Sequence, residues 1–282
     1  MEEKQKTISS QASFSGVGLH SGEPCEVFFK PAPANTGIYF LKNGSPVGTL
    51  GRDHSLFLLD PAARCSAIGA GASRILTVEH VLAAIYGLGI SNLAVDVHGG
   101  EVPAADGSAR PFVELFKKIG IREQKEKRYV YSVGETVLCS EGGKTISIHP
   151  SKHFEISYEL DYDFPYLRDQ RAGFVISPAT FEKEIAPART FCTSEEALEL
   201  KRRGLGLGGS RQNNIVVSAD GEHQKDLRFP DEFARHKILD MIGDLSLLGF
   251  PVLGRVTGVR SGHALNRRLV QAIRAQKESH GK

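Results

Sequence analysis

The sequence has little of what marks membrane, nucleic-acid-binding and disulfide-rich proteins. No apolar run approaches the roughly 20 residues that a membrane-spanning helix needs, and the formal net charge is only +2 over 282 residues. The four cysteines, Cys25, Cys65, Cys139 and Cys192, are widely spaced and form no C-x-x-C pair. These absences exclude a disulfide framework and a structural zinc knuckle, and they give no sign of a nucleic-acid partner or a transmembrane segment. We therefore expect a reduced, cytoplasmic protein.

The residues that are present, 40% hydrophobic and 24% charged, are typical of a soluble globular protein. Segments rich in Leu, Ile and Val and interrupted by glycine predict a mixture of helices and sheets. The charged run 122–128 shows no apolar pattern, and we place a domain boundary there. This predicts an N-terminal α+β domain over 1–126 and a C-terminal α+β domain over 127–282.

Both halves show the same order of expected elements: hairpin strands, a helix with a histidine near its start, a glycine, and a strand. In the first half we expect strands at 14–22, 25–30, 37–40, 55–59 and 92–97, and helices at 78–86 and 111–119. In the second half we expect strands at 129–133, 144–148, 154–158, 214–217 and 253–259, and helices at 194–203, at 231–249 and after His263. Thr77 and Asp231 are the expected N-caps of 78–86 and 231–249. We treat internal duplication as a hypothesis.

The predicted helix 231–249 carries three ionisable residues on one stripe. His236, Asp240 and Asp244 recur at i, i+4 and i+8, although the rest of the helix is apolar and is expected to be buried. Buried ionisable groups are costly unless they are paired or bind a metal. An H-x-x-x-D pair is more often a simple ion pair. The alternative is that His236 and Asp240 are two ligands of a metal ion, because imidazole nitrogen and carboxylate oxygen both suit zinc.

His80 is the candidate third ligand, because two similar halves that face each other would bring it next to His236. Together with Asp240 and a water, these residues would form the open three-ligand arrangement that a hydrolytic zinc needs. Glu79, adjacent to His80, is then well placed to take a proton from that water. The alternative interpretation is that Glu79 only favours the positive end of its helix.

His263 follows a glycine in an expected turn and is a candidate proton donor to a departing amine. Asp244 could raise the pKa of His263 for this role, although a single histidine in a turn is as often simply exposed. Lys237 and the Thr190 hydroxyl are candidates for stabilising a developing oxyanion. The sequence around Lys237 or Thr190, taken alone, would not identify either residue as part of a site.

Six motifs occur in an order that is specific to one enzyme family. They are Thr77-Val78-Glu79-His80, Ala188-Arg189-Thr190-Phe191, Gly204-Leu205-Gly206-Leu207-Gly208-Gly209-Ser210, Arg235-His236-Lys237-Ile238-Leu239-Asp240, Ile242-Gly243-Asp244-Leu245 and Ser261-Gly262-His263. Together they resemble the UDP-3-O-acyl-N-acetylglucosamine deacetylases, the zinc amidases of bacterial lipid A synthesis. The glycine-rich motif is not a phosphate-binding P-loop, because no Lys-Ser/Thr follows it.

The resemblance implies an α+β fold of two similar domains, each a layered β-sheet and α-helix sandwich with a small insert. The active site would lie at the interface of the two domains. By position, the metal ligands of the family correspond to His80, His236 and Asp240, and its general base to Glu79. The remaining catalytic positions correspond to His263 as acid or electrostatic stabiliser, its partner Asp244, and Lys237 and Thr190 around the reacting acetamide.

The resemblance also implies the substrate contacts. The segment 164–167 and the helix from Ser194 with its glycine loop resemble the second insert of the family and the walls of its acyl-chain passage. The residues that we expect to contact substrate are Phe164, Phe191, Gly208, Gly209 and Ser210.

The implied reaction is the zinc-dependent removal of the N-acetyl group from UDP-3-O-acyl-N-acetylglucosamine. The products are UDP-3-O-acyl-glucosamine and acetate, and the reaction is the committed step of lipid A biosynthesis. We expect Zn²⁺ as cofactor, with Fe²⁺ as the alternative in the cell, and a monomeric enzyme. Two other hypotheses stay open. The chain could be a catalytically silent protein that binds a metal or a nucleotide sugar, or it could be a zinc amidohydrolase for another N-acyl sugar. The presence of Glu79 and His263 argues against the silent protein, because metal binding needs neither.

Overall fold

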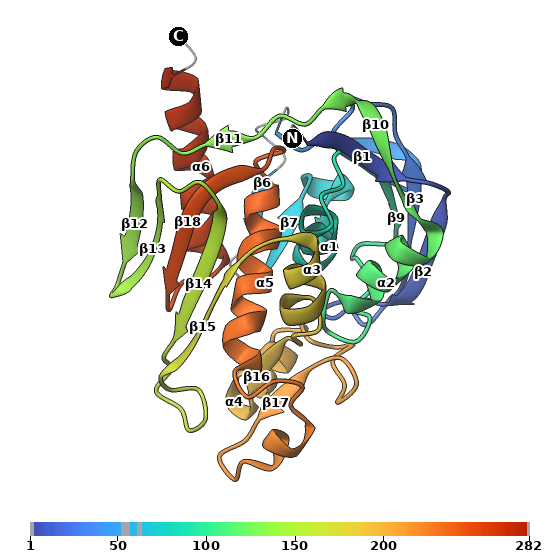
Figure 1. Cartoon of the computed structure of the whole chain (residues 1–282). Coiled ribbons are helices and arrows are strands. Elements are labelled where there is room, and N and C mark those ends of the chain that lie inside the picture. Colours follow the sequence, from blue (N-terminus) through green and yellow to red (C-terminus); the bar gives the residue numbers. More distant parts are fainter. Residues whose placement is uncertain (1–2, 52–56, 61–63, 281–282) are drawn as a thin grey trace.

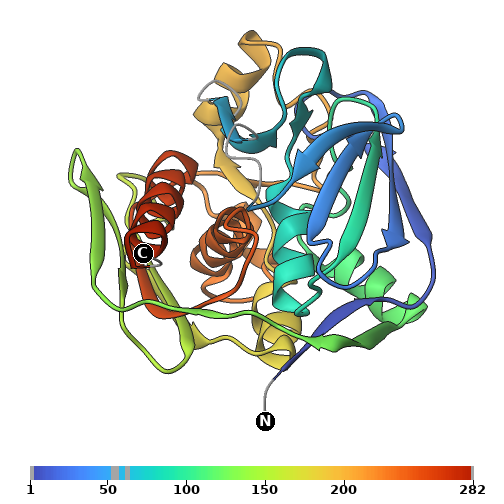
Figure 2. The same cartoon turned by 90° about the horizontal axis from the view of Figure 1, so that it is seen from above.

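Two β-sheets, one from each half of the chain, form the frame of the protein (Figure 1). The computed structural model describes residues 3–51, 57–60 and 64–280. Between the sheets run two helices, α1 (Glu79–Gly87) and α5 (Glu232–Ser246), which pack side by side (Figure 2). This arrangement confirms the predicted α+β class with its layers of sheet and helix.

The sheet of the first half has five strands in the order β2, β3, β9, β4, β5. Their bounds are β2 (Ala12–Val17), β3 (Pro24–Pro31), β4 (Ile38–Lys42), β5 (Ser45–Thr49) and β9 (Leu93–His98). Burial alternates along β3, so Val27 and Phe29 face the core. The ring of Phe29 lies 6.4 Å from Phe112 and 4.8 Å from Phe116, and these contacts hold α2 (Arg110–Ile119) on this face.

The sheet of the second half has the same plan. Its strands lie in the order β12, β13, β18, β14, β15, and the short β11 also pairs with β18. Their bounds are β11 (Tyr131–Ser132), β12 (Val137–Glu141), β13 (Lys144–His149), β14 (Phe154–Leu160), β15 (Gln170–Val175) and β18 (Val252–Val259). In both sheets the central strand is antiparallel to the neighbour from the first hairpin and parallel to the neighbour from the second. The shared strand order and directions support the hypothesis of internal duplication.

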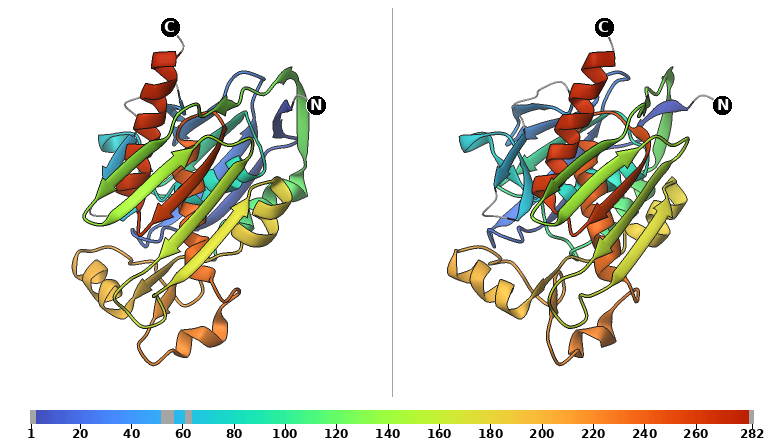
Figure 3. Two further views of the ribbon diagram at one scale, coloured as in Figure 1. Left: turned by 60° about the vertical axis from the view of Figure 1, so that its left-hand side comes forward. Right: turned by 90° about the vertical axis from the view of Figure 1, so that its left-hand side faces the viewer.

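In each half one helix precedes the central strand and one follows it. Helices α1 and α5 precede β9 and β18, and α2 and α6 (His263–His280) follow them. Figure 3 shows α6 lying across the second sheet, where it packs on β12 and β13 and contacts α5. Within the described ranges, no helix is both long enough and apolar enough to cross a membrane.

Each half carries a small insert between its last hairpin and the helix that precedes the central strand. The first insert contains the three-stranded sheet β6 (Phe57–Asp60), β7 (Cys65–Ile68) and β8 (Ile75–Leu76), with the turn η2 (Gly71–Ser73). The second contains α3 (Pro178–Thr180), η3 (Phe181–Ile185), β16 (Phe191–Thr193), α4 (Ser194–Arg202), β17 (Ile215–Val217) and η4 (Glu222–Asp226). The inserts touch, because the Arg64 guanidinium lies 2.7 Å from the Glu196 carboxylate of α4.

Of the two predicted N-caps, Thr77 was wrong, whereas Asp231 holds the predicted N-cap position of α5 but does not cap it with its side chain. Thr77 has a φ of 56°, and its hydroxyl donates to Oε1 of Glu101 at 2.6 Å, so it does not cap α1. Asp231 does precede α5, but its carboxylate accepts a hydrogen bond from Nε of Arg235 at 2.6 Å and none from the helix backbone. In each case another side chain binds the residue that was expected to cap the helix: Glu101 binds Thr77, and Arg235 of α5 binds Asp231.

The charged run at the predicted domain boundary is a strand and not an open linker. It forms β10 (Ile121–Lys127), which pairs antiparallel with β1 (Lys4–Ile8), more than a hundred residues earlier. The two domain ranges themselves stay a prediction. Of the predicted strand 55–59, residues 55 and 56 lie outside the described residues, and the rest belongs to β6.

Gly243 lets α5 approach the start of α1 at backbone contact. A Cβ atom at Gly243 would lie 2.2 Å from the backbone oxygen of Glu79. The first turn of α1 is therefore held directly against the middle of α5. This contact sets the distance between the side chains that the two helices contribute to the site.

Replacing Gly243 with alanine is expected to destabilise the protein by about 1–3 kcal/mol, because the helices must separate to accept the methyl group. The measurement is the shift of the denaturant midpoint relative to the unchanged protein. Gly134→Ala is the control, since an added Cβ there meets no atom within 4 Å. If both variants unfold at the same midpoint, the contact at Gly243 does not constrain the helices.

Candidate active site

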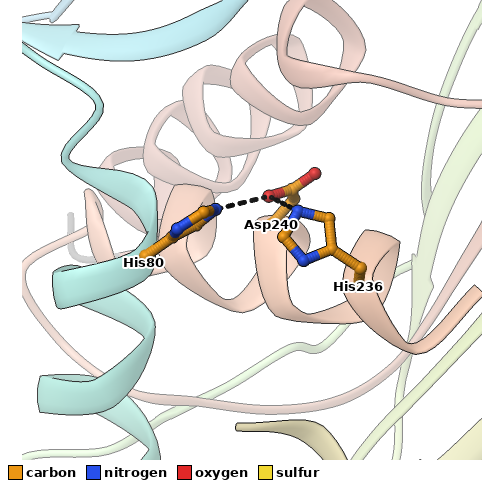
Figure 4. A group of neighbouring side chains, drawn as sticks. All are labelled: His80, His236 and Asp240. Atoms are coloured by element: carbon orange, nitrogen blue, oxygen red, sulfur yellow. Dashed lines mark ion pairs between the residues drawn. The ribbon is translucent and has the colours of Figure 1, made fainter. Parts of the chain in front are cut away.

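Three metal-ligating side chains converge where α1 meets α5 (Figure 4). His80 lies in the first turn of α1, and His236 and Asp240 lie one turn apart on α5. The Nε2 atoms of His80 and His236 are 3.8 and 3.4 Å from Oδ1 of Asp240. One donor atom from each residue lies within 4.8 Å of the other two. The structure thus brings together the three residues that the sequence suggested as metal ligands.

The protonation states of these residues suit a metal ion. Burial lowers the pKa of His80 to about 3 and also lowers the pKa of His236, so both imidazoles are neutral and keep a lone pair. Burial acts to raise the pKa of Asp240, but the nearby Lys237 and His236 outweigh it and hold this pKa well below its ordinary value. Two neutral imidazoles and one carboxylate form a donor set that fits zinc or ferrous iron and leaves positions open.

The segment 188–190 supports the metal-ligand cluster from the second insert. Nδ1 of His236 lies 3.0 Å from the carbonyl oxygen of Ala188. Because a carbonyl can only accept, Nδ1 carries the proton and Nε2 is left free to bind a metal. Thr190 donates its backbone N–H to the carbonyl of Gly107 at 2.8 Å, which ties the same segment to the first half.

Glu79 lies next to the cluster and is 4% exposed. Its Oε2 accepts the backbone N–H of Ser66 at 3.1 Å, and its Oε1 lies 3.9 Å from Nε2 of His263. Burial raises the pKa of Glu79 to about 8, although the charge of His263 acts in the opposite direction. A divalent cation on the neighbouring ligands would lower this pKa again, because it would favour the carboxylate.

His263 and Asp244 form a hydrogen-bonded ion pair on the other side of Glu79. Nδ1 of His263 lies 2.8 Å from Oδ2 of Asp244. Burial opposes the charged imidazole, but the contact with Asp244 outweighs it and raises the pKa of His263 to about 9. His263 is therefore an imidazolium at neutral pH, with Nε2 directed toward Glu79.

Lys237 reaches the same cluster from α5. Its Nζ lies 2.9 Å from Oδ2 of Asp240 and 5.5 Å from the ring centre of Phe191. Burial disfavours the ammonium, yet Asp240 outweighs this effect and raises the pKa of Lys237 above its ordinary value. Lys237 is therefore a fixed positive charge beside the metal ligands.

A cavity of about 830 Å³ opens onto these groups and is lined by both halves of the chain. Its wall includes nine of the predicted site residues: Glu79, His80, Thr190, Phe191, Gly209, Ser210, Lys237, Asp240 and His263. The second insert also lines the cavity with α4 and β17, through Ala197, Leu200 and Val216. The cavity therefore joins a polar reaction centre to a partly apolar wall.

Four predicted site residues do not line the cavity. His236 and Asp244 lie behind the residues that they support. Gly208 packs on the first half, where an added Cβ would lie 2.2 Å from the carbonyl oxygen of Gly18. Phe164 packs against the hydrophobic core instead of the cavity.

Sequence reasoning missed two residues that contact Asp244. These are Ser66 on β7 and Asn266 on α6, whose side chains both donate hydrogen bonds to its carboxylate. Ser66 lies at no spacing that indicates a site. Asn266 stands one helical turn after His263, which is the one sequence signal that could have found it.

Comparison with known proteins identifies the family. Residues 5–275 match the family model described as LpxC, UDP-3-O-acyl N-acetylglycosamine deacetylase. The chain belongs to this deacetylase family. The UDP-3-O-acyl-N-acetylglucosamine deacetylase of Anaeromyxobacter sp. strain Fw109-5 is 42% identical over 277 residues, which cover 98% of this chain and 90% of that protein. Two proteins of the same name resemble the chain to a similar degree. The Anaeromyxobacter dehalogenans protein is 39% identical (98% of this chain, 89% of its own), and the Myxococcus xanthus protein 41% (95% and 86%).

A buried carboxylate clamps the segment 188–190 of this deacetylase. Glu232, which is fully buried at the start of α5, accepts hydrogen bonds from the backbone N–H and Nε of Arg189 at 3.0 and 2.8 Å. It also accepts the backbone N–H of Arg228 at 2.6 Å. The Arg189 side chain is only 12% exposed, so its charge depends on this partner.

Replacing Glu232 with alanine is expected to destabilise the protein by about 3–5 kcal/mol, because a buried guanidinium loses its counter-charge. Denaturant unfolding measures the loss. The control is Glu182→Ala, which breaks an exposed pair with Lys117 and should change stability by about 1 kcal/mol or less. Equal losses in the two variants would show that the Glu232 clamp contributes no more than a surface pair.

Proposed function

We propose that this chain hydrolyses the 2-acetamido group of UDP-3-O-acyl-N-acetylglucosamine and releases acetate, with a zinc ion held by His80, His236 and Asp240. The observation that carries the proposal is the arrangement of Glu79 and His263 beside the three candidate ligands. The names of the relatives support the substrate. The product, UDP-3-O-acyl-glucosamine, would be committed to lipid A synthesis.

In the proposed reaction Glu79 is the general base. Bound zinc would supply the Lewis acid that polarises the acetamide carbonyl and makes a water acidic enough to attack it. Glu79 is adjacent to the ligand His80, and its buried carboxylate accepts the proton of the attacking water. The N–H of Ser66 fixes one oxygen of this carboxylate, so the other oxygen, Oε1, is available for the proton.

His263 is the proposed general acid. Its imidazolium lines the cavity, and its Nε2 is the atom that can give a proton to the departing amine. Asp244 holds Nδ1 and compensates the positive charge, so that the ring keeps both its orientation and its proton.

Lys237 and Thr190 are proposed to stabilise the oxyanion that forms from the acetamide carbonyl. Both line the cavity beside the metal ligands. The ammonium of Lys237 is already held by Asp240, so it offers positive charge without a large reorganisation.

The second insert is proposed to hold the 3-O-acyl chain. Phe191, Gly209 and Ser210 line the cavity together with Leu200 and the other apolar groups of α4 and β17. Phe164 is left out of this group because it does not line the cavity. Gly208 acts indirectly, through its close packing on the first half.

We expect the purified protein to release acetate from UDP-3-O-acyl-N-acetylglucosamine, to lose this activity on chelation, and to regain it with zinc. Metal analysis should give one ion per chain, and His80→Ala should lose it, because two ligands hold zinc far more weakly than three. Parallel reconstitution with ferrous iron tests the alternative metal.

Glu79→Gln is the matched control for this experiment. It is expected to keep the metal but to lose at least about a hundredfold in kcat, because an amide cannot accept the proton. If the unchanged protein folds, binds one metal ion and releases no acetate, the result contradicts the proposed reaction and favours a catalytically silent binding protein.

The acetate-releasing activity is expected to fall as the pH rises through about 9. The pKa of His263 is raised to about 9, so the protonated acid is present below this pH and is lost above it. Lys237 does not explain such a fall, because its pKa is raised above its ordinary value. The pH profile of kcat/KM should therefore decrease with a slope of about −1 on the alkaline side.

His263→Gln tests the assignment of the alkaline limb. The variant should lose about a hundredfold in kcat and should lack the limb. An alkaline limb that persists unchanged in His263→Gln would assign it to another group.

A further inference from the structure

The buried carboxylate that supports His263 is itself held by three side-chain donors. Asp244 is 0% exposed, and its Oδ2 accepts Nδ1 of His263 and Nδ2 of Asn266, each at 2.8 Å. Its Oδ1 accepts the hydroxyl of Ser66. Among the described residues, Ser66 is the one side chain that hydrogen-bonds Oδ1. The orientation of the carboxylate about its bond to the rest of Asp244 therefore depends on that hydroxyl.

Ser66 also holds the base on the other side of the site. Its backbone N–H donates to Oε2 of Glu79 at 3.1 Å, and its hydroxyl oxygen lies 3.3 Å from Nδ1 of His263. Ser66 is 1% exposed in β7, and its carbonyl accepts the N–H of Val78 at the start of α1 at 3.3 Å. One residue of the first insert thus contacts both members of the acid–base pair.

We propose that Ser66 is a positioning residue that holds Glu79 and the Asp244–His263 pair in fixed relative positions. Glu79 can then take the proton of the water that attacks the bound acetamide, and His263 can protonate the nitrogen that leaves the same acetamide. The inference rests on the proposed function, because it assigns Ser66 a part in the same reaction. It gives the first insert a role in catalysis in addition to its place in the cavity wall.

Removing the hydroxyl acts on His263 and leaves the base in place. Without it, Oδ1 of Asp244 is a buried acceptor with no donor, and the carboxylate turns to share the remaining donors, His263 and Asn266. The imidazole then leaves the position from which Nε2 faces the substrate. The contact to Glu79 comes from the backbone and is kept in an alanine variant.

The test is Ser66→Ala, measured by acetate release and by metal content. We expect kcat to fall about tenfold, KM to stay within about twofold, and one metal ion per chain to remain bound. The matched control is Ser246→Ala. It removes another buried serine hydroxyl, which donates to the carbonyl of Gly243 at 2.6 Å and lies outside the active-site cavity. This control should retain the kcat of the unchanged protein.

A double-mutant cycle separates positioning from general damage. If Ser66 acts through His263, Ser66→Ala should lower kcat by less than about twofold in a His263→Ala background. An equal tenfold loss in both backgrounds, or a loss confined to KM or to metal content, would overturn the proposal.

A spectroscopic measurement keeps the proposal testable without turnover. The Nδ1 proton that His263 shares with Asp244 should give a downfield proton resonance, identified by its loss in His263→Ala. We expect this resonance to shift or broaden in Ser66→Ala and to stay unchanged in Ser246→Ala. If the unchanged protein releases no acetate, the proposed function fails while this measurement still decides the role of Ser66. A resonance that is identical in Ser66→Ala and in the unchanged protein would overturn the proposed positioning role of Ser66.

Discussion

The backbone contact between α1 and α5 at Gly243 is the constraint on which the rest of the site depends. It places the carbonyl of Glu79 directly against α5, so the two helices cannot slide or separate without losing close packing. Glu79 and His80 come from one helix, whereas His236 and Asp240 come from the other. A site whose ligands must be held to within about 0.5 Å needs such a rigid junction. The glycine at this position therefore acts on the chemistry although it contributes no functional group.

The charges of the site are buried, and their arrangement explains why they are tolerated. Lys237 compensates Asp240, and His263 compensates Asp244, in each case through a hydrogen bond of 2.9 Å or less. Among the described residues Glu79 has no such close cation: the nearest positive group in that part of the chain, His263, is 3.9 Å away. Its pKa is accordingly raised by burial, and its charge state responds to a cation on the neighbouring ligands. Metal binding and activation of the base would thus be coupled through electrostatics.

The parts of the fold and site that sequence could predict are those with a local pattern. The helical spacing of His236 and Asp240 and the order of the motifs led to the correct helices and to the side chains that converge at the cluster. The failures concern partners far away in the chain. Thr77 is engaged by Glu101, and β10 is a strand because it pairs with β1. The hydrogen bond between Ser66 and Asp244 spans 178 residues and leaves no periodicity in the sequence. Phe164 was assigned to the cavity by resemblance alone; it is partly buried against the core and does not line the cavity, and its predicted contact with substrate stays a prediction.

The topology shared by the two halves places two equivalent helices face to face, but the site they form is not symmetric. Each half supplies a histidine near the start of the helix that precedes its central strand. Only α5 adds the carboxylates Asp240 and Asp244 and the ammonium of Lys237, and only α1 adds Glu79. The inserts differ in the same way, since the second lines the cavity with apolar groups while the first reaches across to Asp244 through Ser66. The shared topology thus brings the ligands together, and the differences between the two halves separate the base from the acid.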